Sequence, residues 1–255
     1  MFNFFRPFIF KFSPEIAHSL AIKSLKLNKF PINKIVNSEI LETTFCGKKL
    51  SSPVGVAAGF DKNAEVYNPL FNLGFGFVEV GTITPKPQYG NPKPRVFRLE
   101  EDEALINRLG FNNSGSEEIS SRIFKETKKG VIGINIGPNK DSENRIEDYV
   151  NCFNKFHSLA DYITINISSP NTENLRDFHN QDELNSLVKE LKNEKKKLNS
   201  KIPIAVKVSP DLNDEQIEVV SKILLDQEIE IIIVSNSSDK NRDKLNNINK
   251  LEKGG

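Results

Sequence analysis

The chain has 255 residues and a formal net charge of +1 at neutral pH. This length suffices for one large α/β domain or two small ones, and so small a net charge gives no field that favours nucleic acid. The two cysteines, Cys46 and Cys152, offer no disulfide framework, and the three histidines lack metal-ligand spacing. No run of eighteen apolar residues is present. We therefore expect no metal, no nucleic acid partner and no membrane-spanning helix.

The first 34 residues differ from the rest of the chain. They hold seven of the eighteen phenylalanines, and six basic residues against the single acid Glu15, a net charge of +5. Ser13-Pro14 is a typical helix start. Apolar residues follow at helical spacing, namely Ile16, Leu20, Ala21 and Leu25. A lysine-rich helix with aromatic bulk fits an anionic membrane surface. A helix packed on its own domain fits the composition equally well.

Six segments have the composition and period of β-strands and alternate with helical patterns. They span residues 53–59, 77–84, 131–137, 162–168, 204–209 and 229–236. A short hairpin at 42–52 precedes them. The segment 85–113 is rich in proline and charge, and we expect an irregular, lid-like excursion there.

Helix boundaries between these strands carry recognisable signals. A helix over 64–73 is expected to close at Gly74. Asn180 with Glu183, and Asn213 with Gln216, have the spacing of capping boxes that would start two further helices. Strands and helices that alternate in this way predict a parallel sheet, either doubly wound or closed as a (β/α)8 barrel.

The positions of polar residues favour the barrel. In 162–168 three isoleucines alternate with polar residues, so one face is apolar and the other polar. Lys207 shares a face with Ala205, Asn135 with Gly133, and we expect Thr82 to share a face with Val78 and Val80. Polar groups near the ends of successive strands are typical of a barrel with a ligand over its mouth. The GxGxxG of a dinucleotide fold is absent after the first strand.

Buried polar strand ends need a partner. An unpaired amide in an apolar site costs roughly 2–7 kcal/mol, and a charge costs more. The group to be satisfied comprises Lys62, Thr82, Asn135, Asn166, Lys207 and Asn236. A planar ligand with several acceptors that can become anionic, such as a flavin ring, would satisfy them together. The alternative is a polar network satisfied internally or by water.

Seven segments together resemble a known family. They are AAGFDKNAE at 57–65, EVGTITPKPQYGNPKPRVFRL at 79–99, INRLGFNN at 106–113, GINIGPNKD at 133–141, INISSPNTENLR at 165–176, PIAVKVSPDL at 203–212 and VSNSSDKNR at 234–242. Nearly the whole chain resembles the class 2, quinone-linked, membrane-associated dihydroorotate dehydrogenases. Serine at 169, where soluble class 1 relatives carry cysteine, and the phenylalanine-rich N-terminal extension both point to class 2.

The resemblance implies an FMN-dependent oxidoreductase that converts dihydroorotate to orotate in pyrimidine (UMP) biosynthesis and passes electrons to a membrane quinone. Ser169 would be the base that removes the C5 proton of dihydroorotate while hydride leaves C6 for flavin N5. A serine hydroxyl is a poor base without a proton relay. Thr172 and the ring of Phe111 would shape the path of that proton.

The resemblance also implies a set of binding residues. Substrate would be held by Lys62, Asn107, Arg108, Leu109, Gly110, Phe111, Asn166, Asn171, Asn236 and Ser237. FMN would be held by Ala58, Gly59, Phe60, Asp61, Lys62, Thr82, Asn135, Asn166, Lys207 and Ser235. A lysine near the flavin would stabilise the reduced anion electrostatically. Serine stands at 235 and 237, where the family usually has threonine, so each hydroxyl is kept.

The implied organisation is a helical segment, residues 1–38, that gives quinone access at the membrane, followed by an FMN-binding barrel domain, residues 39–255. We expect a monomer bound peripherally to the cytoplasmic face of a bacterial inner membrane. About six of the eight barrel strands are expected, because Gly254-Gly255 matches the start of the family's GGLSG loop. Loops after the last two strands bind phosphate in such barrels. We therefore hypothesise an incomplete copy of a longer protein, without the FMN phosphate site.

Two other functions are compatible with the pattern. One is an aldolase-type lyase that uses Lys62 or Lys207 as a Schiff base in a similar barrel. The other is a non-catalytic fragment that lies on the membrane and binds pyrimidines without turnover.

Overall fold

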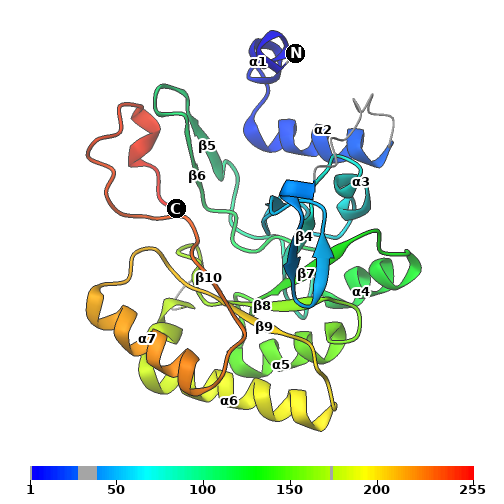
Figure 1. Ribbon diagram of the computed structural model, residues 1–255. Coiled ribbons are helices and arrows are strands. Elements are labelled where there is room, and N and C mark those ends of the chain that lie inside the picture. The colour runs from blue at the N-terminus through cyan, green and yellow to red at the C-terminus, as the bar shows by residue number, and fades with distance from the viewer. Residues whose placement is uncertain (1, 28–38, 173–174) are drawn as a thin grey trace.

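A curled sheet of six parallel strands forms the centre of the computed structural model, which describes residues 2–27, 39–172 and 175–255 (Figure 1). Its strands are β3 (Gly55–Val56), β4 (Phe77–Ile83), β7 (Val131–Ile136), β8 (Tyr162–Asn166), β9 (Ile204–Lys207) and β10 (Ile231–Ile233). They are hydrogen-bonded in chain order, β3-β4-β7-β8-β9-β10. A doubly wound sheet would reverse direction at a switch point. The expected fold class, an incomplete (β/α)8 barrel, is therefore confirmed.

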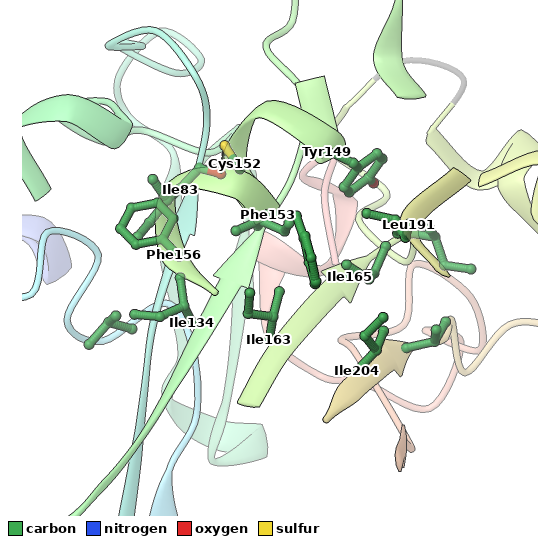
Figure 2. Close-up of a cluster of buried hydrophobic side chains, with 14 of the residues drawn as sticks. Ile83, Ile134, Tyr149, Cys152, Phe153, Phe156, Ile163, Ile165, Leu191 and Ile204 are labelled. Atoms are coloured by element: carbon green, nitrogen blue, oxygen red, sulfur yellow. Dashed lines mark hydrogen bonds between the residues drawn. The ribbon is translucent and has the colours of Figure 1, made fainter. Parts of the chain in front are cut away.

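Helices on the outer face of the sheet bury its apolar side. They are α3 (Tyr67–Phe71), α4 (Ser116–Lys125), α5 (Arg145–Phe156), α6 (Gln181–Lys197) and α7 (Asp214–Asp226). Ile134, Ile163 and Ile165 face Phe153 and Phe156 of α5, and all five side chains are buried (Figure 2). Burying a side chain of this size contributes about 1.5–3 kcal/mol. The predicted alternation of β8 is confirmed, since its isoleucines lie in this core and its polar residues face inward.

A second, smaller hydrophobic core lies at the amino-terminal ends of the sheet strands. The predicted hairpin is formed by β1 (Thr43–Phe45) and β2 (Lys48–Leu50), which follow the short η1 (Glu39–Leu41). Leu50 is buried with Val131, Tyr162 and Ala205. The ring of Phe45 lies edge-on to Tyr162, with centroids 5.2 Å apart. The amino-terminal ends of the strands are thereby sealed by side chains.

The excursion after β4 is more regular than expected. β5 (Val96–Leu99) and β6 (Ala104–Asn107) form an antiparallel hairpin around η2 (Glu100–Asp102). The expectation of an irregular lid is therefore wrong for this part. Leu99 and Ile106 are buried, whereas Leu105 is exposed, which is the pattern of strands with one covered face. η4 (Ile248–Leu251) packs against β5, next to the hairpin in Figure 1.

The N-terminal helices are α1 (Phe2–Ile9) and α2 (Pro14–Lys26). Pro14 begins α2 as predicted, although the Ser13 side chain makes no cap hydrogen bond. Ile22 and Leu25 of α2 enter the main core, whereas Ile16 is 53% and Leu20 45% exposed. The predicted apolar residues are thus divided between two faces. The remainder of the predicted 1–38 segment, residues 28–38, lies outside the described residues, as do residues 173–174 of the 165–176 motif.

Local features correct two further expectations about helices. The helix expected over 64–73 is reduced to α3, because the Asp61 carboxylate accepts hydrogen bonds from the backbone N–H groups of Glu65 and Val66 and holds a turn there. The Asn213 capping box is formed, whereas the Asn180 side chain makes no cap bond at the start of α6, which follows η3 (Leu175–His179).

Thr82 does not share a face with Val78 and Val80, contrary to expectation. The register of β4 against β7 shifts between Val80 and Ile83, which breaks the period of two. Gly81 at this shift has φ +112°, and a Cβ there would lie 2.4 Å from the carbonyl oxygen of Asn135, so glycine is required. Val78 and Val80 enter the helix-side core, and Thr82 turns to the inner face.

Candidate active site

One cavity of about 490 Å³ lies at the carboxyl-terminal ends of the strands, between the sheet, α2 and the β5–β6 hairpin. It is lined by fifteen of the residues predicted from the sequence. These are Ala58, Gly59, Phe60, Lys62, Thr82, Asn107, Leu109, Gly110, Phe111, Asn166, Ser169, Asn171, Lys207, Asn236 and Ser237. Ser169 and Lys62, from loops after different strands, therefore lie in the same site. A cavity of this size suits a small-molecule ligand.

Three predicted side chains form the floor of the cavity, which we define as Thr82, Asn135 and Asn166. The Thr82 hydroxyl donates to Asn135 Oδ1 at 2.6 Å. Asn166 Nδ2 donates to the Thr82 hydroxyl at 3.0 Å and to Asn135 Oδ1 at 3.2 Å. Asn135 is fully buried and lies behind the lining. The floor is therefore a rigid hydrogen-bonded unit that joins β4, β7 and β8.

Glu79 supports the floor and was missed by the sequence reasoning. Its carboxylate accepts hydrogen bonds from Asn135 Nδ2 at 2.8 Å, Tyr162 Oη at 3.0 Å and Thr164 Oγ1 at 2.9 Å. Burial and this carboxylate raise the pKa of Tyr162 well above its ordinary value. An acidic residue inside the otherwise apolar segment 77–83 was the available signal, because a buried charge requires partners.

Two lysines bring positive charge to the cavity. Neither the Lys62 nor the Lys207 ammonium group forms a hydrogen bond or an ion pair with another of the described residues. Burial, with a smaller contribution from the nearby Arg95, lowers the pKa of Lys62 to about 8, against the opposing effect of Glu15. Burial also lowers the pKa of Lys207, against the effect of Glu79. Two ammonium groups in this setting would attract an anionic ligand.

The loop after β8 supplies the predicted base. Ser169 is 5% exposed, and its hydroxyl oxygen accepts the backbone N–H of Asn171 at 3.2 Å. The hydroxyl of Thr172 is buried and has no hydrogen-bond partner among the described residues. Phe111 lines the cavity with φ +51°, a conformation that non-glycine residues rarely adopt. Thr172 follows Ser169 by three residues but does not itself line the cavity.

Three other predicted binding residues do not line the cavity. The Asp61 carboxylate turns into its own loop, as described above, and burial raises its pKa. The Arg108 guanidinium pairs with Glu252 and lies over the ring of Phe97, 4.5 Å from its centroid. The Ser235 hydroxyl donates to the backbone carbonyl of Asn236 at 3.3 Å.

The outer part of the cavity is formed by residues that the sequence reasoning did not single out. These are Pro14, Glu15, His18, Val96, Arg98, Leu105 and Asn112; Gly81 of β4 also lines the cavity, next to Thr82 of the floor. His18 Nε2 lies 2.7 Å from the carbonyl oxygen of Phe60, which ties α2 to the loop after β3. Burial and the Lys62 charge lower the pKa of His18. Composition placed a helix here but could not show that it covers the strand ends.

Fold and site together define a protein of the barrel class whose strand ends surround a pocket lined by two lysines and several amide side chains. The profile described as dihydroorotate dehydrogenase matches residues 40–255. The chain therefore belongs to the dihydroorotate dehydrogenase family, and the resemblance inferred from its motifs is confirmed.

Individual relatives agree with the family assignment. A protein named dihydroorotate dehydrogenase (quinone) from Allorhizobium ampelinum is 46% identical over 241 residues, 92% of this chain and 66% of its own length. Its namesake from Rhizobium etli is 48% identical over 234 residues, 90% of this chain and 65% of its own length. The chain thus spans about two thirds of the length of these relatives. They give the lyase alternative no support.

Solved structures agree as well. The structure of DHODH from Eimeria tenella in complex with ferulenol superimposes with a TM-score of 0.90 at 36% identity, and the match covers 95% of this chain and 72% of that chain. The ligand-free enzyme from the same organism gives the same TM-score and identity, with 74% of its chain covered.

Proposed function

We propose that this protein oxidises (S)-dihydroorotate to orotate with FMN as its cofactor and passes the electrons to a membrane quinone, a step of pyrimidine (UMP) biosynthesis. The observation that carries this proposal is the meeting of Ser169, Lys62 and Lys207 in one cavity over the strand ends. The names of the relatives support the choice of substrate and electron acceptor.

The residues of the cavity fit a flavin ring. Lys207 and Lys62 bring two ammonium groups without partners among the described residues, and an isoalloxazine that becomes anionic on reduction would satisfy both. Gly59 has φ +108°, and a Cβ there would meet nothing within 4 Å, so the loop beside the cavity leaves open space. The floor and the Ala58–Gly59 backbone would hold the ring. When bound, FMN supplies a hydride acceptor and carries two electrons onward.

Ser169 takes the C5 proton of dihydroorotate in the proposed reaction. Its oxygen already accepts the Asn171 N–H, so its own proton is left to be donated onward. The buried hydroxyl of Thr172, which has no partner among the described residues, would accept that proton, and the ring of Phe111 would shape the water path by which it leaves the cavity. This relay would allow a hydroxyl of ordinary acidity to act as the base.

The substrate is proposed to lie between charged and amide groups. Lys62 would bind its carboxylate as a point charge. Asn107 at the end of β6, Asn171 after β8 and Asn236 after β10 line the same cavity and would pair with the edge of the pyrimidine ring. We propose a monomer as the functional unit.

The N-terminal helices would form the route for the quinone. Pro14, Glu15 and His18 of α2 line the outer cavity. Phe8 of α1, Phe12 between the two helices, and Ile16 and Leu20 of α2 are exposed, which supports peripheral contact with a membrane; we propose that this is its cytoplasmic face. Within the described residues no helix is long and apolar enough to cross a bilayer. We propose residues 1–38 as the quinone-access segment and 39–255 as the FMN-binding domain.

The test is to purify the chain, measure its flavin content, and follow dihydroorotate-dependent reduction of a soluble quinone. We expect the chain to bind added FMN, dihydroorotate to bleach the absorption of the bound FMN, and the quinone to reoxidise it. A chain that binds FMN and orotate but never bleaches would support the non-catalytic alternative. Absence of any FMN binding at millimolar concentration would contradict the proposal.

A further inference from the structure

A buried carboxylate below the cavity orients the polar groups above it. Glu79 is 5% exposed and accepts three hydrogen bonds, all of them from side chains on β7 and β8. None of the roles assigned above uses this residue. A carboxylate can only accept hydrogen bonds, so each group that faces Glu79 must present a donor. Asn135 is therefore compelled to turn its Nδ2 group toward Glu79.

The orientation of the Asn135 amide determines which groups of the floor donate hydrogen bonds and which accept them. With Nδ2 on Glu79, Oδ1 faces the other way and accepts the hydroxyl proton of Thr82. Asn166 uses both Nδ2 hydrogens, one on Thr82 and one on Asn135. Thr82 thus has no proton to offer to the cavity that it lines, and keeps one lone pair for it.

Reversal of the Asn135 amide would invert this arrangement. Nδ2 would then point at Thr82 and at the Nδ2 group of Asn166, and the Thr82 hydroxyl would have to accept from Asn135. The Thr82 proton would be released toward the cavity, and the floor would present a donor in place of an acceptor. The carboxylate of Glu79 is the group that excludes this state.

We propose that Glu79 is a positioning residue that holds Thr82 as a hydrogen-bond acceptor and so selects a ligand with a ring N–H at the floor of the cavity. The inference rests on the proposed function, in which that ligand is FMN. Oxidised isoalloxazine carries a single ring N–H, at N3, and methylation of N3 removes it. The Glu79 carboxylate also favours the protonated form of Lys207 on the same cavity.

The test compares the affinities of FMN and N3-methyl FMN in the wild type and in Glu79→Gln. Glutamine keeps the size of the side chain but allows either orientation of Asn135. The dissociation constant of N3-methyl FMN divided by that of FMN is expected to be about tenfold smaller in Glu79→Gln than in the wild type, the effect of roughly one hydrogen bond. Tyr162→Phe is the matched control, since it removes one donor from the same carboxylate but leaves Asn135 oriented. Its ratio should stay within about twofold of the wild type, and FMN affinity should be similar.

Each result has a defined meaning. Wild-type protein that binds no FMN would overturn the proposed function and this inference with it. Wild-type protein that binds FMN while folded Glu79→Gln keeps the full ratio would overturn the inference alone. If Glu79→Gln does not fold, as judged by circular dichroism, Thr82→Val replaces it. This variant removes the acceptor, so the wild-type preference for FMN over N3-methyl FMN should again fall about tenfold. A preference that stays at the wild-type value would overturn the inference.

Discussion

The guanidinium of Arg95, just before β5, donates to the carboxylate of Glu15 on α2, with Nη2 at 2.6 Å and Nε at 3.1 Å. Arg95 is 3% exposed and also donates to the backbone carbonyls of Tyr89 and Asn91. One buried cation thus joins the N-terminal helix to the hairpin excursion, on either side of the outer cavity. The position of α2 over the strand ends depends on this contact.

Removal of Glu15 should therefore be costly. Glu15→Ala leaves a buried guanidinium without its counter-ion, and we expect about 3 kcal/mol less free energy of unfolding. Glu118→Ala is the matched control, since Glu118 is also in the first turn of a helix and pairs with Arg122 but is 58% exposed. Its loss should be at most about 0.5 kcal/mol. Urea unfolding of both variants measures the difference, and equal losses would contradict the anchoring role.

The same pair predicts a dependence on pH. Burial acts to raise the pKa of Glu15, but the hydrogen bond and charge of Arg95 outweigh it and hold the pKa below its usual value. A carboxyl whose pKa is lower in the folded state stabilises the protein above its unfolded pKa, and this contribution is lost as the pH falls through the folded pKa. Acid unfolding of wild-type protein should therefore be steeper than that of Glu15→Gln.

Replacement of Ser169 tests the proposed base. Ser169→Ala should slow the reduction of bound flavin by dihydroorotate about 10²–10⁴-fold, the usual contribution of a positioned general base. Orotate affinity should change little, because the alanine removes only a hydroxyl. Stopped-flow absorbance in single turnover separates this step from quinone reduction. Ser121→Ala, an exposed position on α4, is the control and should react at the wild-type rate.

Lys62 predicts how ligand affinity varies with pH. Its pKa of about 8 means that the charge is lost as the pH rises through that value. The dissociation constant of orotate should therefore increase by up to about tenfold per pH unit above pH 8. The increase stops once Lys62 is neutral in the orotate complex as well. Lys62→Arg should bind with a flat profile over the same range, since arginine stays charged. Isothermal titration between pH 6.5 and 9.5 measures both, at roughly half-unit intervals, and a flat wild-type profile would contradict the role of Lys62.

The pH dependence that Lys62 gives to the stability of the fold is opposite in sign to the one it gives to orotate affinity. The unfolded lysine keeps its proton to a higher pH than the buried one, so between these two pKa values the unfolded state binds more protons. The contribution of Lys62 to stability therefore rises with pH over the interval in which orotate binding weakens. As the pH rises over this interval, the affinity for orotate should fall while the contribution of Lys62 to the free energy of unfolding increases.

The barrel could be predicted because the strands obey a simple period. Ile163, Ile165 and Ile167 fall on the helix side and Asn166 faces inward, as the alternation requires. The cavity followed from this arrangement, since polar residues near the ends of parallel strands meet at one edge. Side-chain period therefore placed Asn135, Asn166 and Lys207 at this edge, whereas most of the loop residues that line the cavity were implied only by the family resemblance.

The remaining features depend on contacts that no local pattern encodes. A register shift at Gly81 turned Thr82 inward, and single-strand alternation cannot anticipate it. Glu79 is intelligible only through its donors on β7 and β8, which lie far along the chain. The closure of the cavity by α2 depends likewise on Arg95, some eighty residues away. Tertiary contacts decided each of these outcomes.

Two helix starts with the same sequence signal offer a last test. Asn213 Oδ1 accepts the Gln216 N–H at 2.8 Å, and Gln216 Oε1 accepts the Asn213 N–H at 3.1 Å, which completes the box. Asn180 makes no such bond. Asn213→Ala should therefore lower the free energy of unfolding by about 1 kcal/mol. Asn180→Ala should cost less than about 0.5 kcal/mol, as for an ordinary surface substitution. Urea titration of the two variants measures both, and equal losses would mean that spacing, not the bond formed, determines capping.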